Sequence, residues 1–293
     1  MGEALLYGLV GLAILLVLWP TRSGAAKFLR RWGVAEPTEE QVAPALRYLR
    51  DRRLLYPLLF VLVPPVAGAV AELFGLPTPT AGALRHLASG IAALLIAEVV
   101  AALRPVRGAR VATLTPRRWR DLLPRWGVAL LSTLAAVSLL SAFAGLSAQS
   151  WARRAVGAVG FSEPYRAEVA RPVGVVVVVG VVLGLVAVLG VVRLAVRRGS
   201  VADPAVDAVL RTRSARVAVG IGMAWMAWMV TLANGRLSAL HSLSRSSGDG
   251  PGWLGAVRLI DSVGLLVLLV GVLGWIWVAN PPSRTARAVE PGR

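Results

Sequence analysis

The sequence predicts an all-α protein, a polytopic bundle of seven transmembrane helices. Hydrophobic residues make up 56% of the 293 residues and charged residues only 16%, a balance that a water-soluble domain of this size does not carry. Seven long apolar segments follow one another along the chain. The basic residues lie between these segments and form no separate basic domain. This composition excludes a soluble enzyme and a nucleic-acid-binding module.

Each apolar segment has close to the roughly 20 residues that a helix needs to cross a hydrocarbon core about 30 Å thick. The predicted spans are residues 4–19, 54–74, 87–103, 127–147, 173–192, 217–234 and 262–279. The valine-rich fifth span has no ionisable side chain, whereas Glu98 interrupts the third. A cleaved signal peptide is the alternative for the first span. We expect a retained anchor there, because basic residues follow its apolar run and do not precede it.

The basic residues also predict the orientation of the chain. Connections 20–53, 104–126 and 193–216 and the tail after residue 279 hold 24 of the 32 basic residues. Such residues resist translocation, so we expect these segments in the cytoplasm and the N-terminus outside. Of the 32 basic residues only Lys27 is lysine, which we interpret as the codon bias of a GC-rich bacterial genome. The predicted location is therefore a bacterial cytoplasmic (inner) membrane.

Three short matches, in the same order, indicate an internal duplication. Residues 34–37 read VAEP and residues 201–204 read VADP, residues 46–53 are similar to 210–216, and GALRHLAS at 82–89 is similar to GAVRLIDS at 255–262. Spans one to three would then be repeated as spans five to seven. Because span four separates the copies, both would face the same way, as a parallel 3+1+3 arrangement. Chance similarity in a chain rich in Ala, Val and Leu is the alternative.

The duplication divides the chain into four parts. We expect a first repeat with a cytoplasmic amphipathic helix in residues 1–103, and a linker with span four and an outer interfacial segment in 104–172. The second repeat would occupy 173–280 and a disordered cytoplasmic tail 281–293. Residues 238–252, rich in serine and glycine and containing His241, are expected to form an outer loop.

Two resemblances follow from these features. The 3+1+3 layout resembles SWEET-type sugar transporters in architecture only, since Pro64 and Pro65 of span two have no counterpart in span six. The motif LTPRR at 114–118, followed by Asp121 and Pro124, is similar to those of uncharacterised multi-pass membrane proteins of high-GC actinobacteria. The first resemblance implies transport of a solute, and the second implies no particular activity.

Ionisable side chains in or next to the spans are the candidate functional residues, because each costs free energy in lipid. Polar residues at the outer ends of spans two, three, six and seven are predicted to line a vestibule that binds a polar or charged solute: Glu72, Arg85, His86, Asn234, Arg258 and Asp261. Solvated flanks, with Glu72 paired to Arg85, are the alternative. Glu98 is the deepest charge and a candidate ion or proton site. An ion pair with Arg104 or a neighbouring loop arginine is its alternative.

Two amphipathic segments flank the spans on the predicted cytoplasmic side. Residues 39–53 and 204–216 each combine an apolar face with arginines on the other face. They are expected to lie on anionic lipid at the cytoplasmic face or to dock a cytoplasmic protein, such as an ATPase subunit. Gly180 and Gly184 form a G-x-x-x-G pair that fits either internal packing or dimerisation, so the oligomeric state stays open.

The sequence carries no signature of catalysis. It has no cysteine, no nucleotide-binding or hydrolase motif, and two histidines without the spacing of metal ligands. We therefore expect no enzyme activity, no cofactor and no metal. Two functions remain. The duplication favours a solute transporter or the membrane component of a transport system, whereas the lack of polar residues near mid-membrane favours a non-transporting accessory or interaction protein. The sequence places transport first.

Overall fold

The computed structural model describes residues 19–73, 83–103, 118–158, 162–197, 203–259 and 263–280. Within these ranges every regular element is a helix. The helices are α2 (Arg22–Arg31), α3 (Glu39–Leu73), α4 (Ala83–Leu103), α5 (Arg125–Ser147), α6 (Gln149–Ala158), α7 (Glu163–Ala170), α8 (Val173–Arg197), α9 (Pro204–Ser247) and α10 (Val263–Ala279), with the 3-10 helices η1 (Trp119–Asp121) and η2 (Gly252–Leu259). The first predicted span, apart from Trp19, and the tail 281–293 lie outside the described residues.

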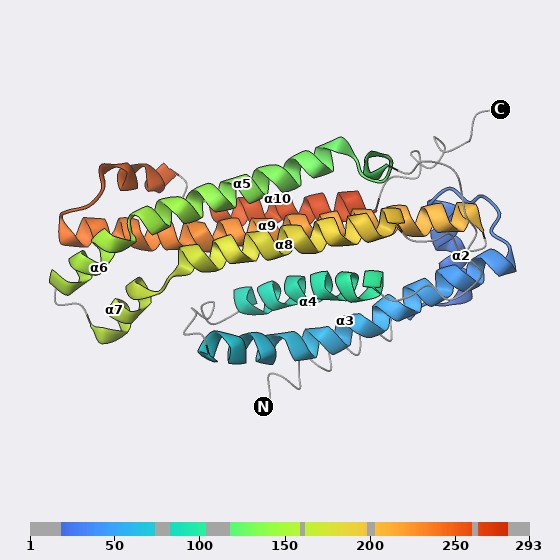
Figure 1. Cartoon of the computed structure of the whole chain (residues 1–293), viewed down its shortest axis with the longest axis horizontal. Coiled ribbons are helices and arrows are strands. Elements are labelled where there is room, and N and C mark those ends of the chain that lie inside the picture. Colours follow the sequence, from blue (N-terminus) through green and yellow to red (C-terminus); the bar gives the residue numbers. More distant parts are fainter. Residues whose placement is uncertain are drawn as a thin grey trace.

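Helix α9 runs through the middle of the bundle, with α5, α8 and α10 beside it and the α3–α4 hairpin along one side (Figure 1). Its 44 residues extend about 66 Å at 1.5 Å per residue, roughly twice the thickness of a hydrocarbon core. The middle of α9 is enclosed, and the side chains of Met223 and Met226 are 0% exposed. Every other long helix therefore packs, directly or through a neighbour, on α9.

The long helices alternate in direction, so their connections gather at two ends of the bundle (Figure 1). We call the end that holds α2, η1 and the starts of α3 and α9 the basic end. Helices α6, α7 and η2 form the opposite end. Exposed tryptophans lie near both ends, with Trp119, Trp126 and Trp277 at the basic end and Trp253 at the other. Tryptophans at two levels are typical of the two interfaces of a membrane.

Four helices of the described chain, α3, α5, α8 and α9, are long and apolar enough to cross a membrane. Helix α10 becomes a fifth if it is joined to η2, from which it departs at a 54° bend. The apolar part of α4, Leu87–Leu103, is shorter than these. The prediction of an all-helical protein with several apolar helices, compatible with a membrane, is confirmed. The full set of seven spans and their orientation stay predictions.

Two helices are longer than the sequence indicated. The amphipathic segments 39–53 and 204–216 are continuous with spans two and six, as α3 and α9. Helix α9 also continues through residues 238–247, so the expected outer loop around His241 was wrong. Leu237, Leu240 and Leu243 recur at helical spacing there and are buried against α6 and η2. The helix ends only before Gly248, whose φ of +68° forms a left-handed cap.

The apolar faces of the two amphipathic segments face each other. Leu46 and Leu49 of α3 pack with Val206 and Leu210 of α9, and Leu29 of α2 completes this small core. A lipid surface or a protein partner would therefore meet the arginine-bearing faces of these helices and not the apolar ones. We call this core, together with α2 and the helix segments 39–53 and 204–216, the head.

Gly180 and Gly184 of α8 bring that helix close to α9. A Cβ atom on Gly184 would lie 2.5 Å from Cδ1 of Trp225, and one on Gly180 would lie 2.6 Å from Sδ of Met229. The indole Nε1 of Trp225 donates a hydrogen bond to Gly180 O at 2.8 Å, which fixes the ring. The G-x-x-x-G pair is thus occupied by packing inside the chain.

We predict that Gly184→Ala destabilises the protein by about 1–3 kcal/mol, because the tryptophan ring cannot move away without losing its hydrogen bond. Thermal unfolding of the purified protein in detergent would measure the loss. Gly190→Ala on the same helix is the matched control, since a Cβ atom there meets nothing within 4 Å. Equal unfolding temperatures for the two variants would contradict the close α8–α9 contact.

Candidate functional site

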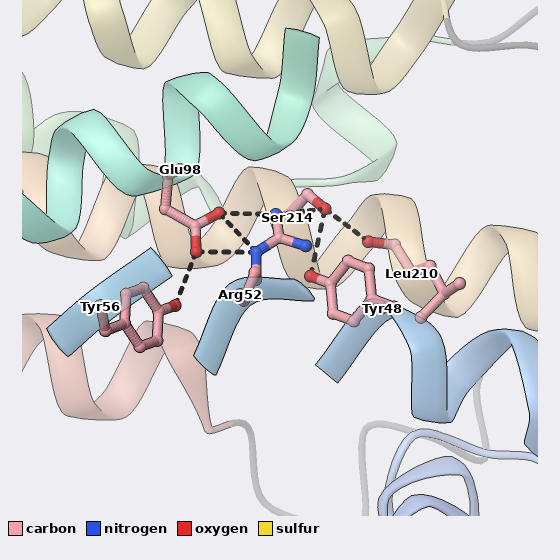
Figure 2. A network of polar contacts seen from close by, with 6 residues as sticks. All are labelled: Tyr48, Arg52, Tyr56, Glu98, Leu210 and Ser214. Atoms are coloured by element: carbon pink, nitrogen blue, oxygen red, sulfur yellow. Dashed lines mark hydrogen bonds and ion pairs between the residues drawn. The ribbon is translucent and has the colours of Figure 1, made fainter. Parts of the chain in front are cut away.

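The only deep charge predicted within a span, Glu98, lies at the junction of α3, α4 and α9. Helix α3 carries Tyr48, Arg52 and Tyr56 four residues apart, so that their side chains share one face of the helix. That face is turned towards Glu98 of α4 and Ser214 of α9 (Figure 2). Three segments that are distant in sequence thus contribute to one polar cluster between the helices, near the head.

Arg52 and Glu98 form a two-pronged ion pair. Arg52 Nε donates to Glu98 Oε1 at 2.8 Å and to Oε2 at 3.0 Å, and Nη2 donates to Oε2 at 2.6 Å. Glu98 is 0% exposed and Arg52 6% exposed. Tyr56 adds a hydrogen bond from its hydroxyl to Glu98 Oε1 at 2.9 Å. Both carboxylate oxygens are therefore occupied by donors from α3.

The same arginine links the hairpin to α9. Its Nη2 also donates to Ser214 Oγ at 3.1 Å, while Ser214 Oγ donates to Leu210 O at 2.8 Å. Because that bond uses the serine hydrogen, the Tyr48 hydroxyl is the donor to Ser214 Oγ at 3.2 Å. The guanidinium of Arg52 lies 4.0 Å from the centre of the Tyr48 ring. A chain of hydrogen bonds thus runs from α4 through α3 to α9 (Figure 2).

The cluster works as a clamp more readily than as an open ion site. Charged groups out of water lose their hydration, and the loss is repaid only where the geometry is good and the remaining donors and acceptors are bonded. Here Glu98 is neutralised by Arg52 and hydrogen-bonded by Tyr56. A cation or a proton would reach the carboxylate only after Arg52 had moved away. The arrangement therefore holds three helices together.

A comparison of the chain with protein-family models, with curated proteins and with solved structures finds no match.

The structure describes the side chains of three of the six predicted vestibule residues. Glu72 is exposed near the end of α3, and Arg258 is exposed on η2. The end of α3 and η2 lie on opposite sides of the bundle (Figure 1), so these two residues are not brought together. Asn234 is 8% exposed on α9, and its Nδ2 atom would be 3.2 Å from a Cβ atom on Gly264 of α10. It lies between helices.

The other three vestibule residues remain predictions. Arg85 and His86 lie in the first turn of α4, where side chains are outside the described part, and Asp261 lies outside the described residues. The described residues include no group of three or more histidine, aspartate or glutamate side chains that could hold a metal ion.

Sequence reasoning identified Glu98 but not the residues around it. The alternative of an ion pair with Arg104 or a neighbouring loop arginine is met by Arg52, which lies in the connection 20–53 and is part of the long helix α3. Tyr48, Tyr56 and Ser214 were not singled out. The signal was the four-residue spacing of Tyr48, Arg52 and Tyr56, which places an arginine between two hydroxyl groups on one helix face.

Two further arginines are buried along α9. Arg211 is 4% exposed and forms an ion pair with Asp207, one turn before it, at 2.6 Å. At the opposite end Arg236 is 7% exposed, and its Nη2 donates to Gln149 Oε1 and to Val169 O, both at 2.7 Å. These contacts tie α6 and α7 to α9. Arg236 thus fastens the central helix to its neighbours at this end, whereas the Arg211 pair lies within α9.

The first residue before α9 completes the head. Asp203 Oδ1 accepts from Val206 N at 2.9 Å, and Oδ2 accepts from Gln41 Nε2 at 2.6 Å. Burial alone would raise the pKa of Asp203, but the hydrogen bonds from Gln41 and from the backbone of Val206 and Ala205 outweigh it and lower the pKa below its ordinary value. The carboxylate caps α9 and joins it to α3.

We predict that Glu98→Gln destabilises the protein by about 3–5 kcal/mol, because it leaves the Arg52 charge buried without a counter-charge. Arg52→Met should cost a similar amount, and the double variant Arg52→Met, Glu98→Gln, which leaves neither charge of the pair, should recover most of the loss. Thermal unfolding of the four proteins in detergent would complete the cycle. Glu72→Gln, at an exposed carboxylate on α3, is the control and should unfold like the parent. Additive losses in the double variant would contradict the clamp.

Proposed function

We propose that this protein is a multi-pass protein of the bacterial cytoplasmic membrane whose head is a docking platform for an acidic cytoplasmic protein. In this proposal the membrane-spanning bundle carries the platform and transports nothing itself. The supporting observation is the clamp of Arg52, Glu98 and Ser214, which fixes the head to the bundle where α3, α4 and α9 meet. A rigid platform binds a partner without the loss of conformational entropy that ordering of its segments would cause.

Helix α2 is the face of the head that suits an acidic partner. Its exposed side chains include Arg22, Lys27, Arg30 and Arg31, and the helix contains no acidic residue. Leu29, on the buried side of α2, packs into the core of the head.

Aromatic residues fasten α2 to α9. The guanidinium of Arg213 lies 5.2 Å from the Phe28 ring, and that of Arg216 lies 5.7 Å from the Trp32 ring. Such cation–π contacts use arginines of α9 to hold α2 in place. The basic residues of α2 are thereby left for a partner.

The hydroxyl groups in the middle of the bundle support a structural role for the bundle more than a path for a solute. The single hydroxyl hydrogen of Ser138 on α5 is shared between Leu134 O at 2.8 Å and Met226 O of α9 at 3.1 Å. The hydroxyl hydrogen of Thr231 on α9 is shared in the same way between Ala227 O at 3.0 Å and Gly264 O of α10 at 3.1 Å. These hydroxyl groups join helices and are satisfied within the protein.

The orientation and the duplication are part of the proposal. Helices α3 and α9 each run from the head into the bundle, and α4 and α10 each return towards the basic end (Figure 1). A parallel 3+1+3 repeat, with α5 as the bridging crossing, requires these directions, and the three matches within the sequence are what support it. The excess of arginine at the basic end supports its location in the cytoplasm.

Transport is the second candidate, and the construction of the α3–α4 hairpin favours it. Helix α3 contains Pro44, Pro57, Pro64 and Pro65 within one continuous helix, and each proline removes a backbone donor. A bend at these positions would move the hairpin away from α9 and uncover Glu98. Counterflow of a labelled solute or proton flux in vesicles, abolished by Glu98→Gln in a folded protein, would favour this candidate over the platform.

We predict that the basic end is cytoplasmic. Because the chain has no cysteine, a single introduced cysteine reports its own location. In intact cells a membrane-impermeant maleimide should label Arg154→Cys, on α6 at the opposite end, and should label Lys27→Cys, on α2, only after permeabilisation. The reverse pattern would contradict the orientation. Both positions are exposed, so access to solvent is matched.

We predict a charge-dependent contact at α2. A photo-crosslinking amino acid in place of Ser23, which shares a face of α2 with Lys27 and Arg30, should give a discrete protein adduct in living cells. The adduct should fall about tenfold in Lys27→Gln, Arg30→Gln, because attraction of an acidic surface is lost. The variant Arg153→Gln, Arg154→Gln removes two exposed charges from α6 and is the matched control. No adduct, or one indifferent to the α2 charges, would overturn the platform.

A further inference from the structure

A groove lies between α5 and α8 towards the basic end of the bundle, and none of its lining residues belongs to the head. Its volume is about 760 Å³. Leu131 of α5, Val188 of α8 and Val219 of α9 form its floor, and each of them is no more than 6% exposed. Leu189 of α8 forms part of its open side and is 62% exposed. The groove is thus an apolar slot that opens onto the outer surface of the bundle.

Arginines surround the mouth of this groove. Arg118 and Arg120 reach it from η1 and the residue before it, and Arg193 and Arg197 from the last turns of α8. All four side chains are exposed, and the described residues that line the groove include no acidic side chain. Trp119 lies in the same rim, with the Arg120 guanidinium 5.4 Å from its ring centre. The mouth therefore carries four positive charges above apolar walls.

The height of the rim matches a membrane interface. The uncharged part of α8, residues 173–192, is about 30 Å long, which is the thickness of a hydrocarbon core. Arg193 follows immediately, so the arginines begin where the hydrocarbon of a bilayer would end. An exposed tryptophan at that level is typical of the headgroup region. A ligand in the groove would thus have its polar part at the headgroups and its apolar part alongside α8.

We propose that this groove binds an anionic phospholipid from the surrounding leaflet. Its phosphate would lie among Arg118, Arg120, Arg193 and Arg197, whose planar guanidinium groups suit two-pronged contacts with phosphate oxygens. One acyl chain would lie in the slot against Leu131, Val188 and Leu189. Basic pockets between spanning helices are the sequence-readable form of such lipid recognition. The site is separate from the head, so it stands whether or not the head docks a partner.

Charge and shape together select this ligand. A soluble phosphate would use the arginines but leave the apolar slot empty. A zwitterionic lipid would fill the slot, but its own cation would oppose the four arginines. An acidic peptide would meet the arginines from outside the membrane and would gain nothing from Leu189. Only an amphiphile with a net negative headgroup uses both parts of the groove.

The test is binding of phosphatidylglycerol to the full chain, measured by native mass spectrometry after reconstitution in equal parts phosphatidylglycerol and phosphatidylcholine. The parent should retain phosphatidylglycerol preferentially. Arg193→Gln, Arg197→Gln should lower its retention by about tenfold or more, since each arginine near an anionic headgroup contributes roughly fivefold. Arg153→Gln, Arg154→Gln, at the opposite end, removes the same charge and should retain phosphatidylglycerol as the parent does.

A second pair of variants tests the slot. Leu189→Trp should narrow it and reduce phosphatidylglycerol retention with the arginines intact. Leu183→Trp on the same helix is the matched control, because Leu183 is 63% exposed and does not line the groove. The proposal is overturned if Leu189→Trp retains phosphatidylglycerol like the parent, if phosphatidylcholine is held equally well, or if inorganic phosphate displaces the lipid. The last result would assign the arginines to a soluble anion.

Discussion

The ion pair between Arg52 and Glu98 sets the conditions for the rest of the structure. A carboxylate that is 0% exposed is unstable unless a positive group neutralises it, and neutralisation here requires α3 and α4 to lie side by side at one register. The same guanidinium bonds Ser214, so the hairpin also has one register against α9. A shift of one turn between these helices would leave both charges buried and unpaired. The pair therefore specifies which helix meets which.

Helix α9 connects this cluster to the other packed parts of the described structure. Towards one end it packs with α2 and α3 in the head, in its middle it is enclosed by α5, α8 and α10, and towards the other end it packs on α6 and η2. Three separate apolar cores are thus joined by one helix of 44 residues. A disturbance at the head is carried to the bundle by a continuous backbone, because the helix has no loop at which the two parts could move independently. This continuity supports the proposal that the head is a rigid platform.

The sequence predicted the features that depend on local patterns. Apolar length located α5 to within two residues and the start of α8 at Val173, although α8 continues five residues beyond the predicted span. A span must satisfy its own backbone hydrogen bonds, so its apolar length marks a helix. The sequence could not predict that 39–53 and 54–73 are one helix, because a change from amphipathic to apolar composition alters the surroundings of a helix and not its backbone. The serine content around His241 indicated a loop, but buried leucines at helical spacing continue α9 through this segment. Glu98 was recognisable as a buried charge, whereas its partner depended on how α3 lies on α4, which no local pattern contains.

The abundance of arginine also has a structural consequence that composition alone does not disclose. In this chain 31 of the 32 basic residues are arginine, and position 52 needs it. Arg52 donates from Nε and Nη2 to both oxygens of Glu98, and Nη2 also reaches Ser214 on a third helix. A lysine ammonium is a compact point charge without this planar fork, so it could not hold both contacts in one fixed geometry. The same planar group suits phosphate at the mouth of the groove between α5 and α8. One residue type, supplied in excess, thus serves the interior as a clamp and the surface as a contact for anions.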